Sequence, residues 1–167
     1  PISLLESSYL DCVAIGRMPT AAVLFTSGTT GEPKGIVLSN CSILSNIRQV
    51  ELQLEPRPDE VILGFPFFHA MGDTVNLWAM LCLAGGGFPF EAQTIGDLCR
   101  RHGVTLIFST PTFIRLYLKR CARARFSAER KVTLGAEKLS PELADDIRVK
   151  LAIEPLVGYG CTELSPV

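Results

Sequence analysis

Ten consecutive residues, TSGTTGEPKG from Thr26 to Gly35, combine the chemical groups that bind phosphate. They include three glycines, three threonines, one serine and one lysine. Backbone N–H groups and hydroxyls donate hydrogen bonds to phosphate oxygens, and glycine lets the backbone approach a ligand closely. Lys34 adds one mobile positive charge. The segment therefore predicts a loop that holds a polyphosphate, and a flexible surface loop is the alternative.

Two widespread phosphate-binding patterns do not describe this segment. The Walker A pattern needs Gly-Lys-Ser/Thr after a first glycine and four further residues. Here Lys34 follows Pro33 and precedes Gly35. The dinucleotide pattern G-x-G-x-x-G is not present in the segment either. We expect a strand on each side of the loop, over 21–25 and 35–39, and not a helix directly after it.

Composition limits the kind of protein. The chain has 167 residues, 47% hydrophobic and 20% charged, which is typical of a globular α/β unit. A net charge of -1 gives no basic excess, so we expect no nucleic-acid partner. A local basic cluster is expected to be a solvated helix end, or else a contact for an acidic carrier or an anionic surface (Arg120, Arg123, Arg125, Arg130 and Lys131). No two of the six cysteines form C-x-x-C, so we expect scattered reduced thiols.

Apolar runs alternate with helical patterns along the chain. Beyond the two strands beside the loop, strands are predicted over 61–65, 87–90, 104–108, 131–135 and 155–160. Helices are predicted from Asn40 or Ser42 to 54, and over 72–83, 95–102 and 111–124, with another beginning at Ser140-Pro141. This alternation predicts an α/β fold: a layered, mostly parallel sheet with covering helices.

Four stretches resemble one family, in its order and at its spacing. They are FTSGTTGEPKG (25–35), FPFFHAMG (65–72), GAEKL (135–139) and GYGCTE (158–163). Together they are similar to the adenylate-forming, AMP-binding superfamily: acyl-CoA synthetases, adenylation domains of peptide synthetases and luciferases. The resemblance covers roughly Thr20 to Val167. Within it, GAEKL, GYGCTELSPV and STPTFIRLYLKR resemble the acyl-acyl carrier protein synthetase part of bifunctional 2-acylglycerophosphoethanolamine acyltransferases.

The resemblance implies an acid–thiol ligase that uses ATP and Mg²⁺. A carboxylate attacks the α-phosphate of ATP to give acyl-AMP and pyrophosphate, and a thiol then takes the acyl group. The implied acceptor is CoA or the phosphopantetheine group of an acyl carrier protein. Seven positions match the loop that holds the β- and γ-phosphates: Thr26, Ser27, Gly28, Thr29, Thr30, Gly31 and Lys34.

The same resemblance assigns the remaining site residues. Glu163 matches the Mg²⁺ ligand, and a carboxylate suits this hard cation. Thr162 matches the hydroxyl that contacts the α-phosphate. Tyr159 matches the aromatic residue that stacks on adenine, and Gly160 follows it. The adenine-side segment, which acts largely through its backbone, is matched by Gly135, Ala136 and Glu137. The residues implied to act in catalysis are Lys34, His69, Thr162 and Glu163.

His69 bears on the class of acid. It matches the histidine beside the acyl carboxylate, where its implied work is positioning, because a carboxylate needs no base at pH 7. Relatives that activate amino acids carry an aspartate there. Histidine therefore favours an acid without an amine, and a long-chain fatty acid is the expected substrate. Asp73 occupies a position that is apolar in fatty-acid relatives, so we expect it either to line the acyl tunnel or to face solvent.

The domain organisation is expected to be incomplete. Residues 1–167 are predicted to be one α/β piece of the large N-terminal domain, without the small C-terminal lid domain and its catalytic lysine. We expect negligible adenylation by this piece alone, and, because strands are left as open edges, either association or local disorder near the termini. The parent protein is expected in the cytoplasm, with membrane association at the inner face as a property of the parent only. The longest apolar run, 77–84, is shorter than the roughly 20 residues of a membrane span.

Three other functions stay open. The first alternative is a nucleotide-binding relative without catalysis. The second is an amino-acid-activating adenylation domain, and the third is a purely structural α/β domain. Aspartate at position 69 would favour the second of these, and the residue there is histidine.

Overall fold

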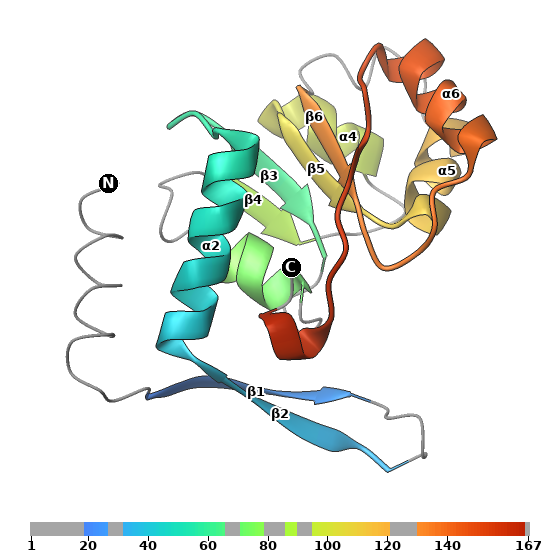
Figure 1. Cartoon of the computed structure of the whole chain (residues 1–167). Coiled ribbons are helices and arrows are strands. Elements are labelled where there is room, and N and C mark those ends of the chain that lie inside the picture. The colour runs from blue at the N-terminus through green and yellow to red at the C-terminus, as the bar shows by residue number, and fades with distance from the viewer. Residues whose placement is uncertain are drawn as a thin grey trace.

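A five-stranded parallel sheet forms the centre of the molecule (Figure 1). The structure, a computed structural model, describes residues 19–26, 32–65, 71–78, 86–89, 95–120 and 130–165. The strand order is β4-β3-β5-β6-β7, and every neighbouring pair is parallel. The strands are β3 (Val61–Gly64), β4 (Gly86–Pro89), β5 (Leu106–Ser109), β6 (Lys131–Leu134) and β7 (Leu156–Val157).

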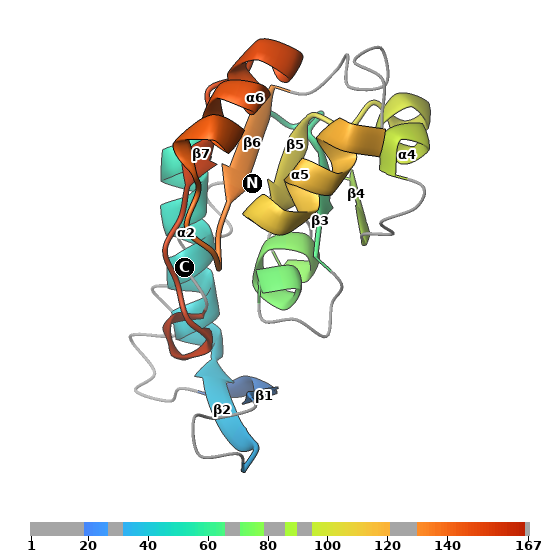
Figure 2. The same cartoon turned by 90° about the vertical axis from the view of Figure 1, so that its right-hand side faces the viewer.

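Helices cover both faces of this sheet (Figure 2). Because side chains alternate along a strand, Leu63 and Ile107 lie on one face and Ile62 and Leu106 on the other. The first face packs against α4 (Ile95–His102), α5 (Pro111–Arg120) and α6 (Pro141–Leu151). The second packs against the end of α2 (Asn40–Leu54), where Leu54 is buried. The predicted α/β fold, a mostly parallel sheet between covering helices, is confirmed.

The two strands beside the glycine-rich loop form a separate hairpin. β1 (Thr20–Thr26) pairs antiparallel with β2 (Lys34–Ser39), and no other strand of the described residues joins them. Leu38 packs into a small core with Ile43 and Ile47 of α2, which fastens the hairpin to the helix. The predicted strands are therefore correct, although the hairpin is not part of the parallel sheet.

The N-cap of α2 lies one residue before the nearer of the two residues that we predicted for it. Ser39, and not Asn40 or Ser42, is the N-cap: the Ser42 N–H donates to Ser39 Oγ and the Ser39 N–H donates to Ser42 Oγ, both at 3.1 Å. The two serines thus satisfy each other's backbone donors in a capping box. An expectation based on residue type could not choose between serines because each is a good cap.

Residues 72–78 differ from the α-helix predicted over 72–83. They form a π-helix, η1 (Gly72–Trp78), and residues 79–83 lie outside the described part of the chain. Trp78 Nε1–H donates to Asp73 Oδ2 at 3.2 Å, and the two residues are five apart. This spacing is that of one π-helical turn, in which residues i and i+5 are paired. Trp78 also packs against the core of the hairpin.

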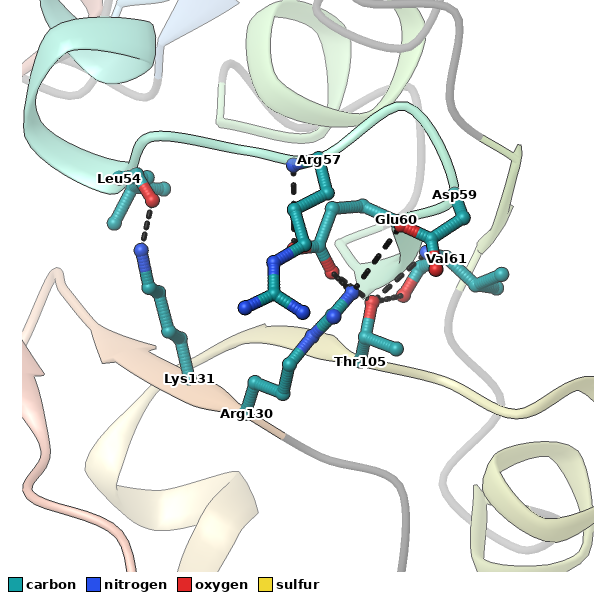
Figure 3. A network of polar contacts seen from close by, with 8 residues as sticks. All are labelled: Leu54, Arg57, Asp59, Glu60, Val61, Thr105, Arg130 and Lys131. Atoms are coloured by element: carbon teal, nitrogen blue, oxygen red, sulfur yellow. Dashed lines mark hydrogen bonds and ion pairs between the residues drawn. The ribbon is translucent and has the colours of Figure 1, made fainter.

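A polar network holds the amino ends of three strands together (Figure 3). Glu60 is 4% exposed, and its carboxylate accepts a hydrogen bond from Thr105 Oγ1 and lies 2.8 Å from Arg130 Nη2. These residues directly precede β3, β5 and β6, and we call them the amino-end network. The Val61 N–H in turn donates to Thr105 Oγ1 at 2.9 Å.

No helix among the described residues has the length and hydropathy of a membrane span.

Candidate functional site

Two of the predicted site segments meet at the carboxyl edge of the sheet. β6 is followed by Gly135, Ala136 and Glu137, and β7 is followed by Gly158 and Tyr159. The strands are parallel neighbours, and the Gly158 N–H donates to the Leu134 carbonyl at 2.8 Å. Parallel strands end at a common edge, so residues that are more than 20 positions apart in the sequence lie side by side there. Ligands of open α/β sheets bind at this edge.

An open cavity of about 370 Å³ lies between these two segments. Its lining consists of Ala136, Glu137, Lys138, Val157, Gly158, Tyr159 and Gly160. The Tyr159 side chain is 85% exposed, so its ring is not a core residue. An exposed ring beside a cavity can stack on a planar ligand such as a nucleobase. The structure thus brings together the residues that we predicted on the adenine side: Gly135 to Glu137 with Tyr159 and Gly160.

A second cavity, of about 310 Å³, lies behind the first, between α2 and the strands. Most of the lining is apolar; it consists of Gln49, Val50, Gln53, Leu54, Met71, Phe108, Thr133, Leu134, Gly135, Leu156, Val157 and Gly158. Val157 and Gly158 line both cavities. Met71 belongs to the FPFFHAMG stretch that resembles the acyl-site motif. The structure therefore places part of that motif beside the adenine-side segment.

Gly135 lies where these cavities meet, and the end of the Met71 side chain occupies the space beside it. A Cβ atom at this position would lie 2.8 Å from Met71 Cε and 3.5 Å from the Gly158 carbonyl oxygen. Two carbon atoms that are not bonded do not come as close as 2.8 Å, so a Cβ at position 135 would require Met71 Cε to move. The absence of a side chain at Gly135 therefore lets Met71 reach the wall of the second cavity.

The residues predicted to contact phosphate lie at the hairpin. Thr26 ends β1 and is the register partner of Lys34, which begins β2 and is exposed. Thr162 and Glu163 belong to a short 3-10 helix, η3 (Thr162–Leu164), which lies beside β2 (Figure 1). This proximity brings a carboxylate and a hydroxyl to the hairpin that carries Lys34. Several predicted residues lie outside the described part of the chain: Ser27, Gly28, Thr29, Thr30, Gly31 and His69.

The predicted metal ligand is a single carboxylate. Among the residues that the structure describes, no group of three or more His, Cys, Asp or Glu is arranged to hold a metal ion. Mg²⁺ commonly binds through one or two carboxylates together with waters and substrate phosphates. An exposed Glu163 beside the hairpin fits this mode, and its role as the Mg²⁺ ligand stays a prediction.

Asp73 is neither exposed nor among the described residues that line the second cavity. Its side chain is buried against α2 and the sheet and accepts the hydrogen bond from Trp78. The expectation that Asp73 faces solvent was wrong, because the π-helical turn directs it inward onto Trp78. Burial raises the pKa of the Asp73 carboxyl above its ordinary value, and the hydrogen bond from Trp78 opposes this shift.

Sequence reasoning missed Thr112 and most of the lining of the second cavity, including Met71. Thr112 donates a hydrogen bond to Glu137, and Met71 lines the second cavity. Met71 had a signal, since it lies in a quoted motif. Thr112 lies in the quoted stretch STPTFIRLYLKR, but its partner Glu137 is 25 residues away, and only the tertiary structure brings the two together.

Comparison with known proteins supports the assignment of this site. The sequence pattern of the AMP-binding enzyme family matches residues 12–167. The chain belongs to this family. 4-Coumarate–CoA ligase 3 of Arabidopsis thaliana is 32% identical over 95% of the chain, and the match covers 30% of that protein. Mitochondrial medium-chain acyl-CoA ligase ACSF2 of Bos taurus is 31% identical over 87% of the chain and 26% of that protein.

A solved structure agrees with these matches. ATP-bound MatB from Rhodopseudomonas palustris superimposes with a TM-score of 0.77 at 29% identity, over 88% of this chain and 30% of that one. The AMP-binding chain therefore spans about a third or less of the length of these relatives. Both curated relatives are named as CoA ligases, so the family includes enzymes that join acids to thiols.

Proposed function

We propose that this AMP-binding chain contributes the nucleotide-binding and acid-binding part of an ATP-dependent acid–thiol ligase. One observation carries the proposal: the adenine-side segment and the GYGCTE segment meet around one cavity, and an apolar cavity shares their wall. A nucleotide and an acid bound in these cavities would lie next to each other. Transfer to the α-phosphate of ATP needs this proximity, because the reaction is governed mainly by positioning and by neutralising charge.

ATP fits the first cavity and the hairpin beside it. The exposed ring of Tyr159 stacks on adenine, and the backbone at Gly135 to Glu137 borders the base. Lys34 neutralises phosphate charge from the hairpin, and Thr162 donates to the α-phosphate. Glu163 binds the Mg²⁺ that offsets the charge of the nucleotide. These roles bring positive charge to a step in which one anion approaches another.

The acid fits the second cavity. Its mostly apolar wall, which includes Val50, Leu54 and Phe108, suits an alkyl or aryl body, and none of the described residues that line it carries a charge. Together with histidine at position 69, this wall supports a carboxylic acid without an amine, and we propose a fatty acid. The resemblance of GAEKL and GYGCTELSPV to acyl-acyl carrier protein synthetases supports a phosphopantetheine carrier as acceptor, with CoA as the other candidate. Such a parent protein acts in the cytoplasm, at the inner face of the membrane if it belongs to phospholipid metabolism.

The test is ATP–pyrophosphate exchange by the intact parent protein, with carboxylic acids of increasing chain length. We expect exchange with wild type and a loss of at least about 100-fold in Lys34→Ala, because the charge on the leaving pyrophosphate is no longer neutralised. The control is Lys150→Ala: Lys150 is an exposed lysine of α6 that pairs with Asp146 at 3.3 Å, and its removal should leave exchange unchanged.

The outcomes separate the candidate functions. Exchange with fatty acids that collapses in Lys34→Ala supports the ligase. Exchange with amino acids alone would make the chain an adenylation domain of a peptide synthetase. ATP binding without exchange for any acid would contradict the ligase and leave a nucleotide-binding relative without catalysis.

A further inference from the structure

We propose that α5 positions the nucleotide-binding loop, through Thr112 as the main positioning residue and Arg115 as a second contact. The loop consists of residues 135–140, between β6 and α6, and we call it the adenine loop. This inference rests on the proposed function, since it concerns how the same site holds its nucleotide. Neither Thr112 nor Arg115 is among the residues that the family resemblance assigns to the site.

Two side chains of the adenine loop bind to one side of α5. Glu137 Oε2 accepts hydrogen bonds from the Thr112 N–H at 3.2 Å and from Thr112 Oγ1 at 2.6 Å. Arg115 Nη2 donates to Ser140 Oγ at 3.3 Å. Thr112 and Arg115 are three residues apart, so they lie on the same side of the helix. The adenine loop is therefore hydrogen-bonded to α5 at two of its residues, Glu137 and Ser140.

The negative charge of Glu137 lies at the amino end of α5, where a helix stabilises negative charge. The first N–H groups of a helix have no partner inside the helix, and the helix dipole favours a negative charge at that end. Glu137 supplies both an acceptor and a negative charge to the first turn of α5. Its carboxylate is thereby engaged with α5, which leaves the backbone of the loop to border the nucleotide cavity.

The loop needs such contacts because its backbone is unusual. Ala136 has φ 67°, in the left-handed region that favours glycine. A residue other than glycine stays in this region when the surrounding structure holds it there. The Gly135 N–H donates to the Ser109 carbonyl at 3.1 Å before it, and Glu137 binds Thr112 after it. Both partners flank the junction of β5 and α5, so that junction fixes the loop on each side of Ala136.

Loss of the Thr112 hydroxyl should therefore weaken nucleotide binding. Without the hydroxyl, a smaller fraction of the protein has the loop in its binding-competent conformation. The apparent dissociation constant rises by the factor by which this fraction falls. The Val side chain in Thr112→Val has nearly the same shape, and the variant keeps the backbone N–H. We expect the Kd for ATP to rise about threefold to tenfold, the net worth of one solvent-exposed hydrogen bond.

The experiment is calorimetric titration of the intact parent protein with ATP and Mg²⁺. Three variants are compared with wild type: Thr112→Val, Thr112→Ser and Glu137→Ala. Thr112→Ser restores the hydroxyl and should restore affinity. The double variant Thr112→Val/Glu137→Ala should lose no more affinity than Glu137→Ala alone, because the two residues act through one contact. The KM for the acid and the unfolding midpoint should change little, which a general structural defect would not produce.

The outcomes are separable from those of the proposed function. Unchanged ATP affinity in Thr112→Val would overturn the inference while the ligase activity stands. Additive losses in the double variant would overturn it too, because they would show that the residues act independently. Equal losses of affinity in Thr112→Val and Thr112→Ser would mean that the hydroxyl is not responsible. A wild-type protein that binds no ATP would contradict the proposed function and this inference together.

Discussion

Asp73 is a carboxyl group in a place that disfavours its charge. Only 8% of the residue is exposed, and the indole of Trp78 donates a hydrogen bond to its carboxyl group. The indole N–H donates more strongly to a charged oxygen than to a neutral one, but this contact offsets only part of the cost of burying the charge. The buried carboxyl therefore lowers the stability of the folded protein at neutral pH relative to a neutral residue of the same shape.

We predict that Asp73→Asn stabilises the protein at pH 7 and not at low pH. Because the pKa of Asp73 is raised on folding, the folded state holds this proton to a higher pH than the unfolded state does. The contribution of Asp73 to stability consequently falls as pH rises from about 4, the ordinary value, through the raised one. Thermal unfolding should show a midpoint about 2 °C higher for Asp73→Asn at pH 7. A difference that persists unchanged at pH 3 would show that the charge is not the cause.

Met71 and Gly135 together set the shape of the second cavity. We predict that Met71→Ala shifts the acid preference of the intact parent protein toward bulkier acids, since it removes side-chain atoms from the wall. Gly135→Ala should have the opposite effect, because its Cβ would lie 2.8 Å from the present Met71 Cε and push that atom into the cavity. Pyrophosphate exchange across a series of acids measures both shifts, each expected to be about tenfold in relative rate. If neither variant altered the order of preference, the acid would not bind in this cavity.

At the scale of the strands, the amino-end network stabilises the sheet. Replacing Glu60 by Gln leaves Arg130 beside a neutral amide in a mostly buried place, and we predict a loss of about 2 kcal/mol in the free energy of unfolding. Urea denaturation measures this value. ATP affinity at the opposite, carboxyl edge should stay near wild type.

The matched control for Glu60→Gln is Glu154→Gln. Glu154 also binds an arginine, Arg148, with oxygens 2.7 Å from two of its nitrogens, but on the exposed surface. Solvent screens such a pair, so its loss should change the unfolding free energy little. Equal effects of the two variants would contradict the idea that burial makes the Glu60 contact the stronger one.

The order of the elements could be predicted from the sequence, while several of their details could not. β6, α4 and α6 lie where periodicity and capping residues placed them. β5 begins at Leu106 and not at Val104, although the Thr105 backbone already bonds to Val61 of β3 and to Arg130, directly before β6. The π-helix at Gly72–Trp78 was missed since its apolar pattern resembles that of an α-helix. Such details depend on partners distant in the sequence, which periodicity does not report.

Part of the candidate site could likewise be predicted from the sequence, and part of it could not. The resemblance supplied Gly135 to Glu137 and Tyr159; in the structure Ala136, Glu137 and Tyr159 line the first cavity, and Gly135 lines the second. The contacts that hold this arrangement, such as that of Thr112 with Glu137, could not be predicted from a single sequence, because the partners are 25 residues apart. The roles of Ser27 to Gly31 and of His69 stay predictions, as they lie outside the described residues.

On the scale of the whole molecule, the hairpin presents an apolar face to solvent. Val23, Phe25 and Val37 are 48%, 76% and 63% exposed, and Val23 pairs directly with Val37. The opposite face of the hairpin packs on α2. A contiguous exposed apolar patch on a strand pair promotes association with other protein surfaces.

We predict that the isolated 167-residue chain self-associates through this face. Phe25→Ser with Val37→Thr should lower the sedimentation coefficient toward that of a monomer, because the patch loses most of its apolar area. Val149→Thr is the control, since Val149 is 74% exposed on α6, away from the hairpin. A wild-type chain that is monomeric at high concentration would contradict the prediction.

One edge of the sheet stabilises the fold and the other borders the cavities. This separation affects how the binding preferences of related proteins can change in evolution. The amino edge holds the strands together through Glu60, Thr105 and Arg130, and the carboxyl edge carries the loops that border both cavities. Mutations in those loops can therefore change what is bound without disturbing the contacts that keep the sheet assembled. Loops exchanged at the carboxyl edge between relatives should give folded hybrids with new preferences, and exchanges at the amino edge should give unstable ones.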